Sequence, residues 1–576
     1  MILTMLLEIA RIIIFLASGA ILSYLLFPKT DVVKRFVYSL ALSASLIGIF
    51  KVLLYILNIT SSLIAAPLFF LLLILIPFVL LKLKNNSYKT LYNKDLLYIL
   101  LFSLMGTLWK FFYLNSIKNM DAGYSYAFQF ARGGVPDLGY YTGMALVHSN
   151  YNFNIQNKFI EFLSLNQFIE IFLATFLFLG FIYIIFNECR NRKLALIGVA
   201  LMALGPIELF YLVTRLRTHD LGYAALFSLF LFYKSKEKNT FWLAFFLSAY
   251  MMFSYYTSTL VLILASLGFI LAVLIKELIQ HKKIREILKN RKIWLFIIIL
   301  LMLCIYLEVF TTMNKITTKR IADVSIIKST FTSESIYPGL NPYEDPTFLS
   351  ISAMRWQVLF FFLCGLTFVL YLFIKKDLSE ENRDLVLCLI PIVIITFGFF
   401  YTNYLSRIFN YFAFFGLLAL KIPKKYLKTF LIFGFIFILI TGFYVAKDKK
   451  IFFENSNGEI EAASWVKNNL DGKVFSDQKF INLVILNGYY NITGTCDKCW
   501  VVKALFYNNN LTEFISALNS TNSDYVAITK RMQEKYILMV DYPQKPVQTA
   551  EFFEQNLEKI YDNGDVKIYK TKVKKG

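Results

Sequence analysis

The segment from Asp121 to Pro136 holds the residues best suited to chemistry. It reads Asp-Ala-Gly-Tyr-Ser-Tyr-Ala-Phe-Gln-Phe-Ala-Arg-Gly-Gly-Val-Pro and follows an apolar stretch, 96–114, long enough to cross a bilayer. A carboxylate at the rim of a membrane span can act as a general base toward a hydroxyl held at the lipid–water interface. Asp is also a favoured helix N-cap, so Asp121 equally fits a cap for a helix over 122–131. The two roles are compatible, because a capping carboxylate is held in a fixed orientation.

Four ionisable residues share one short turn: Arg215, Arg217, His219 and Asp220. Charges at the rim of a span are costly and usually mark a functional path. The arginines suit a phosphate, because guanidinium groups pair with phosphate oxygens in bidentate fashion. His219 and Asp220 would orient an acceptor or sugar or bind a divalent metal, and the carboxylates of Asp121 and Asp220 offer the oxygen ligands that Mg²⁺ or Mn²⁺ takes. The alternative is a solvated turn in which Asp220 caps the next helix.

A third set of candidates follows from the long segment 312–352. Loops of this length are usually functional lids or disordered. Within it, Lys319 and Arg320 form a candidate clamp for a lipid phosphate, with a solvated basic pair as the alternative. Arg407 follows a short turn on the same side and is a further phosphate candidate.

The chain that must position these residues has the composition of a polytopic membrane protein. Hydrophobic residues make up 57% of its 576 positions, and runs such as 61–81 carry no charge. Because about 20 apolar residues cross a bilayer, the pattern predicts about 14 spans and an all-α membrane fold. The first stretch lacks a small-residue cleavage site and is interpreted as a retained span. The spans are expected near 6–26, 36–57, 61–81, 96–114, 166–187, 195–214, 219–233, 241–256, 258–276, 293–311, 353–374, 385–401, 408–420 and 429–446.

The net charge of +21 lies almost entirely before residue 447, because the remainder has 18 basic against 16 acidic residues. The basic turns alternate correctly with the spans, which is the positive-inside signature of membrane topology. The long loops 115–165 and 312–352 and the tail then face outward, and no nucleic-acid partner is required. The basic turns are Lys82–Lys94, Arg190–Lys193, Lys234–Lys238, Lys282–Lys292, Lys375–Lys376 and Lys421–Lys428.

The tail, 447–576, has the alternation and turn residues of a small soluble α/β domain. Helices are expected over 459–470 and 511–518, and strands over 473–476 and 524–529. The segment 559–569 places Asn-Gly between two alternating runs, which predicts a β-hairpin. Cys496 and Cys499 favour a local disulfide or two free thiols over zinc, which needs two further ligands.

The first outer loop, Asp121-Ala-Gly-Tyr-Ser-Tyr-Ala with Ala131-Arg-Gly-Gly-Val-Pro136 and Tyr140-Tyr141, resembles that of the GT-C glycosyltransferases. The likeness is to protein O-mannosyltransferases and the lipid A aminoarabinose transferase group. Thr218-His-Asp220 is similar to a second acidic outer-loop motif of this family. Ala122 stands where many members have a second acid, and the tail lacks Trp-Trp-Asp-Tyr-Gly, which speaks against an oligosaccharyltransferase reading Asn-x-Ser/Thr acceptors.

The resemblance implies a function and a division of the chain. It implies inverting transfer of a sugar from a polyprenyl (dolichyl) phosphate to a glycan, lipid or protein hydroxyl on the outer face, with Asp121 as the base. A three-span extension, 1–95, would precede a catalytic core, 96–446, and the extracytoplasmic domain, 447–576. The rival is a polytopic transporter or lipid flippase, although its expected midplane charges are few here. The Lys-, Ile- and Asn-rich usage is typical of an AT-rich prokaryote such as an archaeon.

Overall fold

The computed structural model describes five main parts of the chain. These are 16–56, 89–114, 159–313 without 190–191, 204–217, 236, 255, 281–283 and 288, then 379–399, and 456–573 without 488, 490, 495–509, 535–536, 539–542 and 545–549. Positions 75, 78, 79, 370 and 374 and most of 428–441 complete the set.

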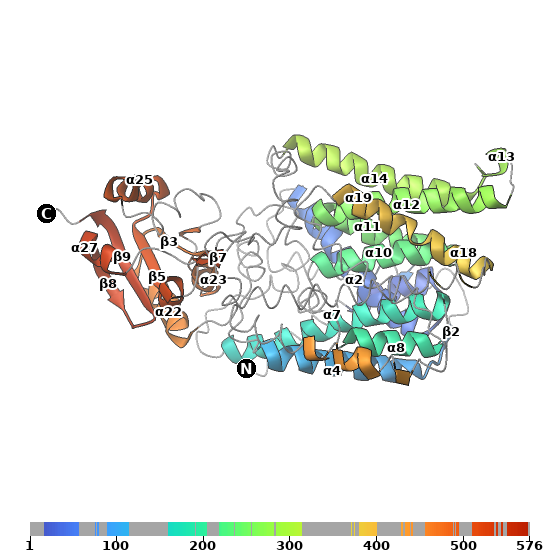
Figure 1. Ribbon diagram of the computed structural model, residues 1–576, viewed down its shortest axis with the longest axis horizontal. Coiled ribbons are helices and arrows are strands. Elements are labelled where there is room, and N and C mark those ends of the chain that lie inside the picture. The colour runs from blue at the N-terminus through green and yellow to red at the C-terminus, as the bar shows by residue number, and fades with distance from the viewer. Residues whose placement is uncertain are drawn as a thin grey trace.

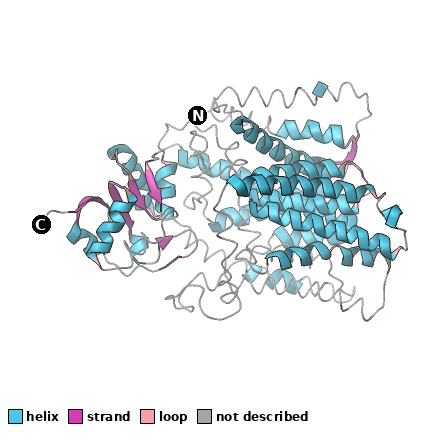
Figure 2. Ribbon diagram, turned by 90° about the horizontal axis from the view of Figure 1, so that it is seen from above, coloured by secondary structure: helices cyan, strands magenta, loops and turns pink. Residues whose placement is uncertain are grey.

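The first four parts form a bundle of apolar helices (Figures 1 and 2). Its longest helix, α7, contacts α2, α4, α8 and α10, while α12 contacts α14 and α19. The helices are α2 (Val32–Ile56), α4 (Asp95–Leu114), α7 (Phe159–Cys189), α8 (Arg192–Ala203), α10 (Thr218–Lys234), α11 (Thr240–Ser254), α12 (Tyr256–Ile279), α13 (Ile284–Ile287), α14 (Arg291–Met313), α18 (Glu380–Leu387) and α19 (Ile390–Phe399).

Two helical segments of the described chain are long and apolar enough to cross a membrane, Phe172–Cys189 and Thr259–Ile279. Both coincide with predicted spans. The predicted span 385–401 differs, because the structure has two helices there, α18 and α19, joined through Cys388 and Leu389. Proline lacks an N–H and fits best in the first turn of a helix, so Pro391 favours a new helix start at this point.

The turns at one end of the bundle are tied together by ion pairs. Lys34 Nζ lies 2.6 Å from Glu188 Oε1, and Lys234 Nζ lies 3.1 Å from Asp384 Oδ2. Asn239 Nδ2 donates to the carbonyl of Leu26 at this same end. We call it the basic end. Lys34 also lies 3.8 Å from Glu237, and Lys292 Nζ donates to the carbonyl of Tyr233, so the turns around residues 190, 234 and 290 lie at one end of the bundle.

Two short strands that the sequence did not predict also lie at the basic end. β1 (Lys29–Asp31) pairs in parallel with β2 (Lys89–Leu91), and Lys29 is in register with Lys89. The helix that follows β1, α2, contacts α7 and α11. At Gly180 of α7, a Cβ would lie 2.2 Å from the Cγ2 of Val37, so only glycine allows this approach of the two helices. The N-terminal part of the chain therefore shares its core with the helices that follow.

The C-terminal part is an α/β domain around a five-stranded sheet of order β4-β3-β5-β9-β8 (Figure 1). β3 pairs in parallel with β4 and β5, while β9 runs antiparallel to β5 and β8. The strands are β3 (Val474–Ser476), β4 (Ile492–Gly494), β5 (Tyr525–Thr529), β8 (Leu557–Asp562) and β9 (Val566–Val573), and a small separate pair is β6 (Ile537–Leu538) with β7 (Pro543–Gln544). The helices are α22 (Asn457–Asn469), α23 (Gln478–Leu486), α25 (Leu511–Thr521), α26 (Lys530–Glu534) and α27 (Ala550–Asn556).

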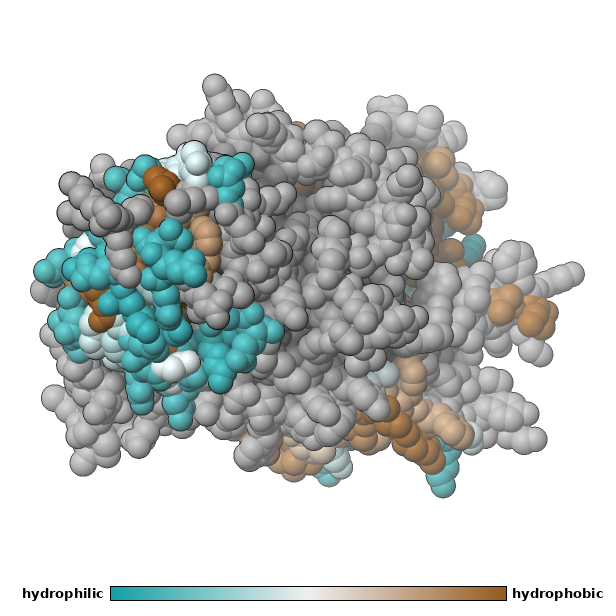
Figure 3. All heavy atoms as spheres, turned by 60° about the vertical axis from the view of Figure 1, so that its left-hand side comes forward, coloured by the Kyte–Doolittle hydropathy of each residue, from teal (hydrophilic) through white to brown (hydrophobic). Residues whose placement is uncertain are grey.

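The predicted elements of this domain are confirmed, including both strands, both helices and the hairpin of β8 and β9. Alternate residues of β5 enter two hydrophobic cores, because successive side chains of a strand point to opposite faces. Val526 and Ile528 join one core with Phe514 of α25, whereas Ala527 joins the other with Val466 of α22. The described surface of the domain is mostly hydrophilic, in contrast to the apolar patches of the bundle (Figure 3).

Candidate functional site

Most of the candidate site residues lie outside the described part of the chain. His219 and Asp220 are described as backbone only, in the first turn of α10. The described part of α10 starts at Thr218, which places the backbone of Asp220 within the helix. The candidates outside the described residues are Asp121, Arg215, Arg217, Lys319, Arg320 and Arg407, and Cys496 and Cys499 also lie there.

The helix ends from which the candidate segments depart are described, and they share one end of the bundle. α4, α7, α10 and α14 each have one terminus at the basic end, at Asp95, Cys189, Lys234 and Arg291. Since a helix rises about 1.5 Å per residue, α10 alone places its other terminus about 25 Å away. The far termini are Leu114, Phe159, Thr218 and Met313. We call this the loop end.

Three segments with candidate residues are therefore connected to the loop end. The segment with Asp121 joins α4 to α7, the turn with Arg215 and Arg217 leads into α10, and the segment with Lys319 and Arg320 follows α14. Figure 1 shows the C-terminal domain beyond this end of the bundle.

Asp95, at the start of α4, is a buried carboxylate that the sequence analysis did not single out. It is 1% exposed and accepts hydrogen bonds from Arg192 Nη2 at 2.6 Å and from the Tyr183 hydroxyl at 2.5 Å. The hydrogen bonds from Arg192 lower the pKa of this carboxyl, against the opposing effect of burial. A carboxylate so completely paired is held as an anion that joins α4, α7 and α8, which is a structural role.

Replacing Arg192 with Gln is expected to lower the thermal unfolding midpoint at neutral pH, because Asp95 would keep its burial and lose its cation. A carboxyl with a lowered folded pKa stabilises the protein above its ordinary pKa of 3.8 and loses that effect as pH falls through the folded pKa. The difference in unfolding midpoint between wild type and R192Q should therefore be constant from neutral pH down to about pH 5, and it should become smaller below that pH. Thermal denaturation of the purified proteins across this range measures it. The exposed Arg383 provides the control R383Q, and an equal loss there would contradict the assignment.

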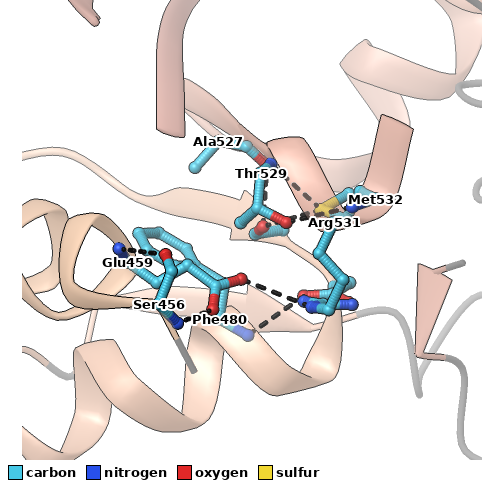
Figure 4. A network of polar contacts seen from close by, with 9 residues as sticks. Ser456, Glu459, Phe480, Ala527, Thr529, Arg531 and Met532 are labelled. Carbon is cyan, nitrogen blue, oxygen red and sulfur yellow. Dashed lines mark hydrogen bonds and ion pairs between the residues drawn. The ribbon is translucent and has the colours of Figure 1, made fainter. Parts of the chain in front are cut away.

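A second polar network lies at the carboxyl ends of β3 and β5 in the C-terminal domain (Figure 4). In α/β sheets these strand ends are where binding sites commonly form. Arg531 is 9% exposed and pairs with Asp477 through both terminal nitrogens, with Nη1 2.8 Å from Oδ2 and Nη2 3.0 Å from Oδ1. Its Nε lies 3.3 Å from Glu459 Oε1. Both carboxylates are buried.

Each carboxylate of this network also caps a helix. Asp477 accepts a hydrogen bond from the backbone N–H of Phe480 at the start of α23. Glu459 and Ser456 form a capping box at the start of α22, visible in the sequence as Ser-x-x-Glu. The network therefore links α22, α23 and α26 at the carboxyl ends of β3 and β5, and its polar groups bond to other groups of the domain.

The described residues contain no group of three or more His, Cys, Asp and Glu side chains placed to hold a metal ion. The candidate ligand Asp121 lies outside those residues, and the side chain of Asp220 is not described. A role for Mg²⁺ or Mn²⁺ therefore stays a prediction from the sequence.

Comparison with protein-family models and with individual curated proteins gives no match. Solved structures do match, among them an archaeal oligosaccharyltransferase, AglB from Archaeoglobus fulgidus, in complex with an inhibitory peptide and a dolichol-phosphate. The match has a TM-score of 0.47 at 12% identity, over 76% of this chain and 70% of that one. The apo form of the Archaeoglobus fulgidus enzyme gives 0.46 and 11% over the same shares. Its complex with Zn and sulfate gives 0.44 and 14%, over 75% and 68%.

These three matches are all structures of the Archaeoglobus fulgidus oligosaccharyltransferase.

Proposed function

We propose that the protein is a membrane glycosyltransferase that moves a sugar from a polyprenyl (dolichyl) phosphate to an acceptor hydroxyl on the outer face of the membrane. The main support is that three segments with candidate residues all connect to helix ends at the loop end. These helix ends are Leu114, Thr218 and Met313. A polyprenyl phosphate is anchored by its tail, so its sugar–phosphate bond lies at the interface, where such segments leave their helices.

In the proposed reaction Asp121 accepts the proton of the acceptor hydroxyl. The hydroxyl oxygen then attacks the anomeric carbon, and the bond from that carbon to the phosphate oxygen breaks with inversion. The polyprenyl phosphate leaves with the bonding electron pair. Arg320 or Arg407 would stabilise the leaving phosphate, because cations already positioned in a site of low dielectric need no reorganisation as charge develops. Lys319, Arg215 and Arg217 would support them.

The first turn of α10 would act on the sugar. His219 and Asp220 lie at the helix terminus that faces the loop end. There they would orient the sugar or acceptor, and Asp220 with Asp121 would be the protein ligands of a bound Mg²⁺ or Mn²⁺. Such an ion usually keeps phosphate and water oxygens as its other ligands.

The proposed division of labour follows the order of the chain. The spans before residue 96 would be an extension that packs on the catalytic core, 96–446, as α2 does against α7 and α11. The domain 447–576 would lie outside the membrane beside the acceptor. Its lack of a Trp-Trp-Asp-Tyr-Gly motif favours a hydroxyl acceptor on a glycan, lipid or protein over the amide of an Asn-x-Ser/Thr sequon.

Incubating the purified protein with dolichyl phosphate carrying radiolabelled mannose or glucose, plus a cell-envelope extract as acceptor, tests this proposal. We expect label to move into the acceptor fraction as an equal amount of dolichyl phosphate is released. A chelator added in parallel shows whether the reaction needs a divalent metal. Transport of the intact labelled lipid across a proteoliposome membrane, with no bond cleaved, would instead identify a flippase.

A further inference from the structure

The ends of three helices at the basic end bring lysine side chains together around one carboxylate. Lys234, the last residue of α10, lies 3.1 Å from Asp384 Oδ2, and Lys276 of α12 lies 2.8 Å from Asp384 Oδ1. Asp384 belongs to α18, which contacts α12. One carboxylate thus serves two ammonium groups.

A third ammonium group joins this cluster from α14. Lys292 Nζ donates to the backbone carbonyls of Tyr233 and Ser235, at 2.7 and 3.0 Å, so its charge meets the C-terminus of α10. Burial lowers the pKa of Lys292 to about 8, and the charges of Lys276 and Lys234 add to the effect while Asp384 opposes it. We call Lys234, Lys276, Lys292 and Asp384 the lysine cluster.

Two other cations at the basic end have at least as many carboxylate partners as ammonium or guanidinium groups. At the same end, Lys34 lies 2.6 Å from Glu188 and 3.8 Å from Glu237, so acidic groups outnumber it. Arg192 is likewise matched by Asp95. Among the described side chains in these three groups, only the lysine cluster has more cations than carboxylates.

Exposed apolar side chains flank the lysine cluster. Ile279, one turn after Lys276 on α12, is 45% exposed, and Trp294, in the first turn of α14 with Lys292, is 53% exposed. Tryptophan is enriched where a protein meets the headgroup region of a bilayer. Cations beside an exposed apolar surface suit a lipid, whose phosphate contacts the ammonium groups while its chains cover the apolar residues.

We propose that the lysine cluster binds the phosphate headgroup of an anionic membrane lipid. Basic pockets between transmembrane helices are a known way of holding such headgroups. A bound phosphate would bring negative charge to three ammonium groups that now have one carboxylate, Asp384, among them. This binding is separate from glycosyl transfer, because it uses neither the loop end nor any of its candidate residues.

The test measures retention of phosphatidylglycerol by the full-length protein in nanodiscs of defined lipid composition. Each lysine near the surface contributes to anionic lipid binding, so Lys276→Gln and Lys292→Gln should each weaken retention about five-fold relative to phosphatidylcholine. Asp384→Asn removes the carboxylate and should strengthen retention, a change of sign that a purely structural role would not give. Lys34→Gln, the same substitution beside two glutamates, is the matched control and should change nothing.

The outcomes separate the possible sources of phosphate. Displacement of the lipid by millimolar inorganic phosphate would show that the phosphate group itself is recognised, and no displacement would show that the lipid chains contribute, both in agreement with the proposal. Thermal midpoints near that of wild type verify that each variant is folded. Equal lipid retention by wild type, K276Q and K292Q would overturn the proposal. An equal loss of lipid retention in K34Q would also overturn it.

Discussion

Replacing Asp121 with Asn is expected to lower the rate of sugar transfer by about 10²–10⁴-fold, the usual contribution of a general base. Asn keeps the size of the side chain and its ability to cap a helix, and it cannot accept the proton of the acceptor hydroxyl. Donor binding should stay near the wild-type level, because the leaving phosphate is held by the cations proposed above. Single-turnover transfer from a radiolabelled dolichyl phosphate sugar measures the chemical step, and equilibrium binding of the same lipid measures the donor affinity.

A matched control for this experiment lies in the same loop. Asp137 follows Pro136 and has no assigned role, so Asp137→Asn alters the loop charge by the same amount and should leave turnover near the wild-type value. Near-normal transfer by D121N would reject Asp121 as the base. Equal loss in both variants would show that loop charge, rather than one carboxylate, governs the rate.

Regular elements could be predicted wherever the sequence has a clear period. The strands over 473–476 and 524–529 alternate and have turn residues at their ends, and both are present as β3 and β5. The Asn-Gly turn predicted the hairpin of β8 and β9, whose register the structure gives in full. These patterns depend on neighbouring residues only, so a single sequence is enough to find them.

Contacts between distant segments could not be predicted in the same way. Asp95 and Arg192 are 97 positions apart, and no local pattern indicates that the carboxylate of one meets the guanidinium of the other. The excess of basic residues indicated which turns share a side, but not that Lys234 and Lys276 would share Asp384. Such pairings depend on how the helices pack, which the apolar period alone leaves open.

The candidate site illustrates the same division. The alternation of spans predicted that the segments carrying Asp121, Arg215 and Lys319 depart from one side, and the helix ends at Leu114, Thr218 and Met313 agree. The role of each side chain was inferred from residue type and from a family resemblance. Distances between these side chains depend on tertiary contacts, which the residue pattern alone does not specify.

In the C-terminal domain, replacing Arg531 with Met is expected to reduce the stability of the domain by about 3–5 kcal/mol, the usual cost of removing one partner of a buried ion pair. Met preserves much of the side-chain volume while removing the cation. Asp477 and Glu459 would then remain buried with no guanidinium between them, and their mutual repulsion would add to the cost of burial. Their helix-capping hydrogen bonds would remain, so the loss should stem from the missing charge.

Hydrogen–deuterium exchange on the full-length protein can localise this effect, because amide exchange reports local opening. Faster exchange is expected in α22 and α23, whose first turns the two carboxylates cap, while the slowest amides of α7 and α12 in the bundle stay unchanged. Lys530→Met is the control: this adjacent lysine is 56% exposed and pairs with Glu534 on the surface, so its loss should cost less than about 1 kcal/mol. Similar exchange rates in R531M and K530M would show that Arg531 does not hold α22 and α23 at the carboxyl ends of β3 and β5. If amide exchange in α22 and α23 were slower in R531M than in wild type, the cost of burying the three charges would exceed their mutual attraction. The network would then serve to specify one arrangement of the helices rather than to stabilise it.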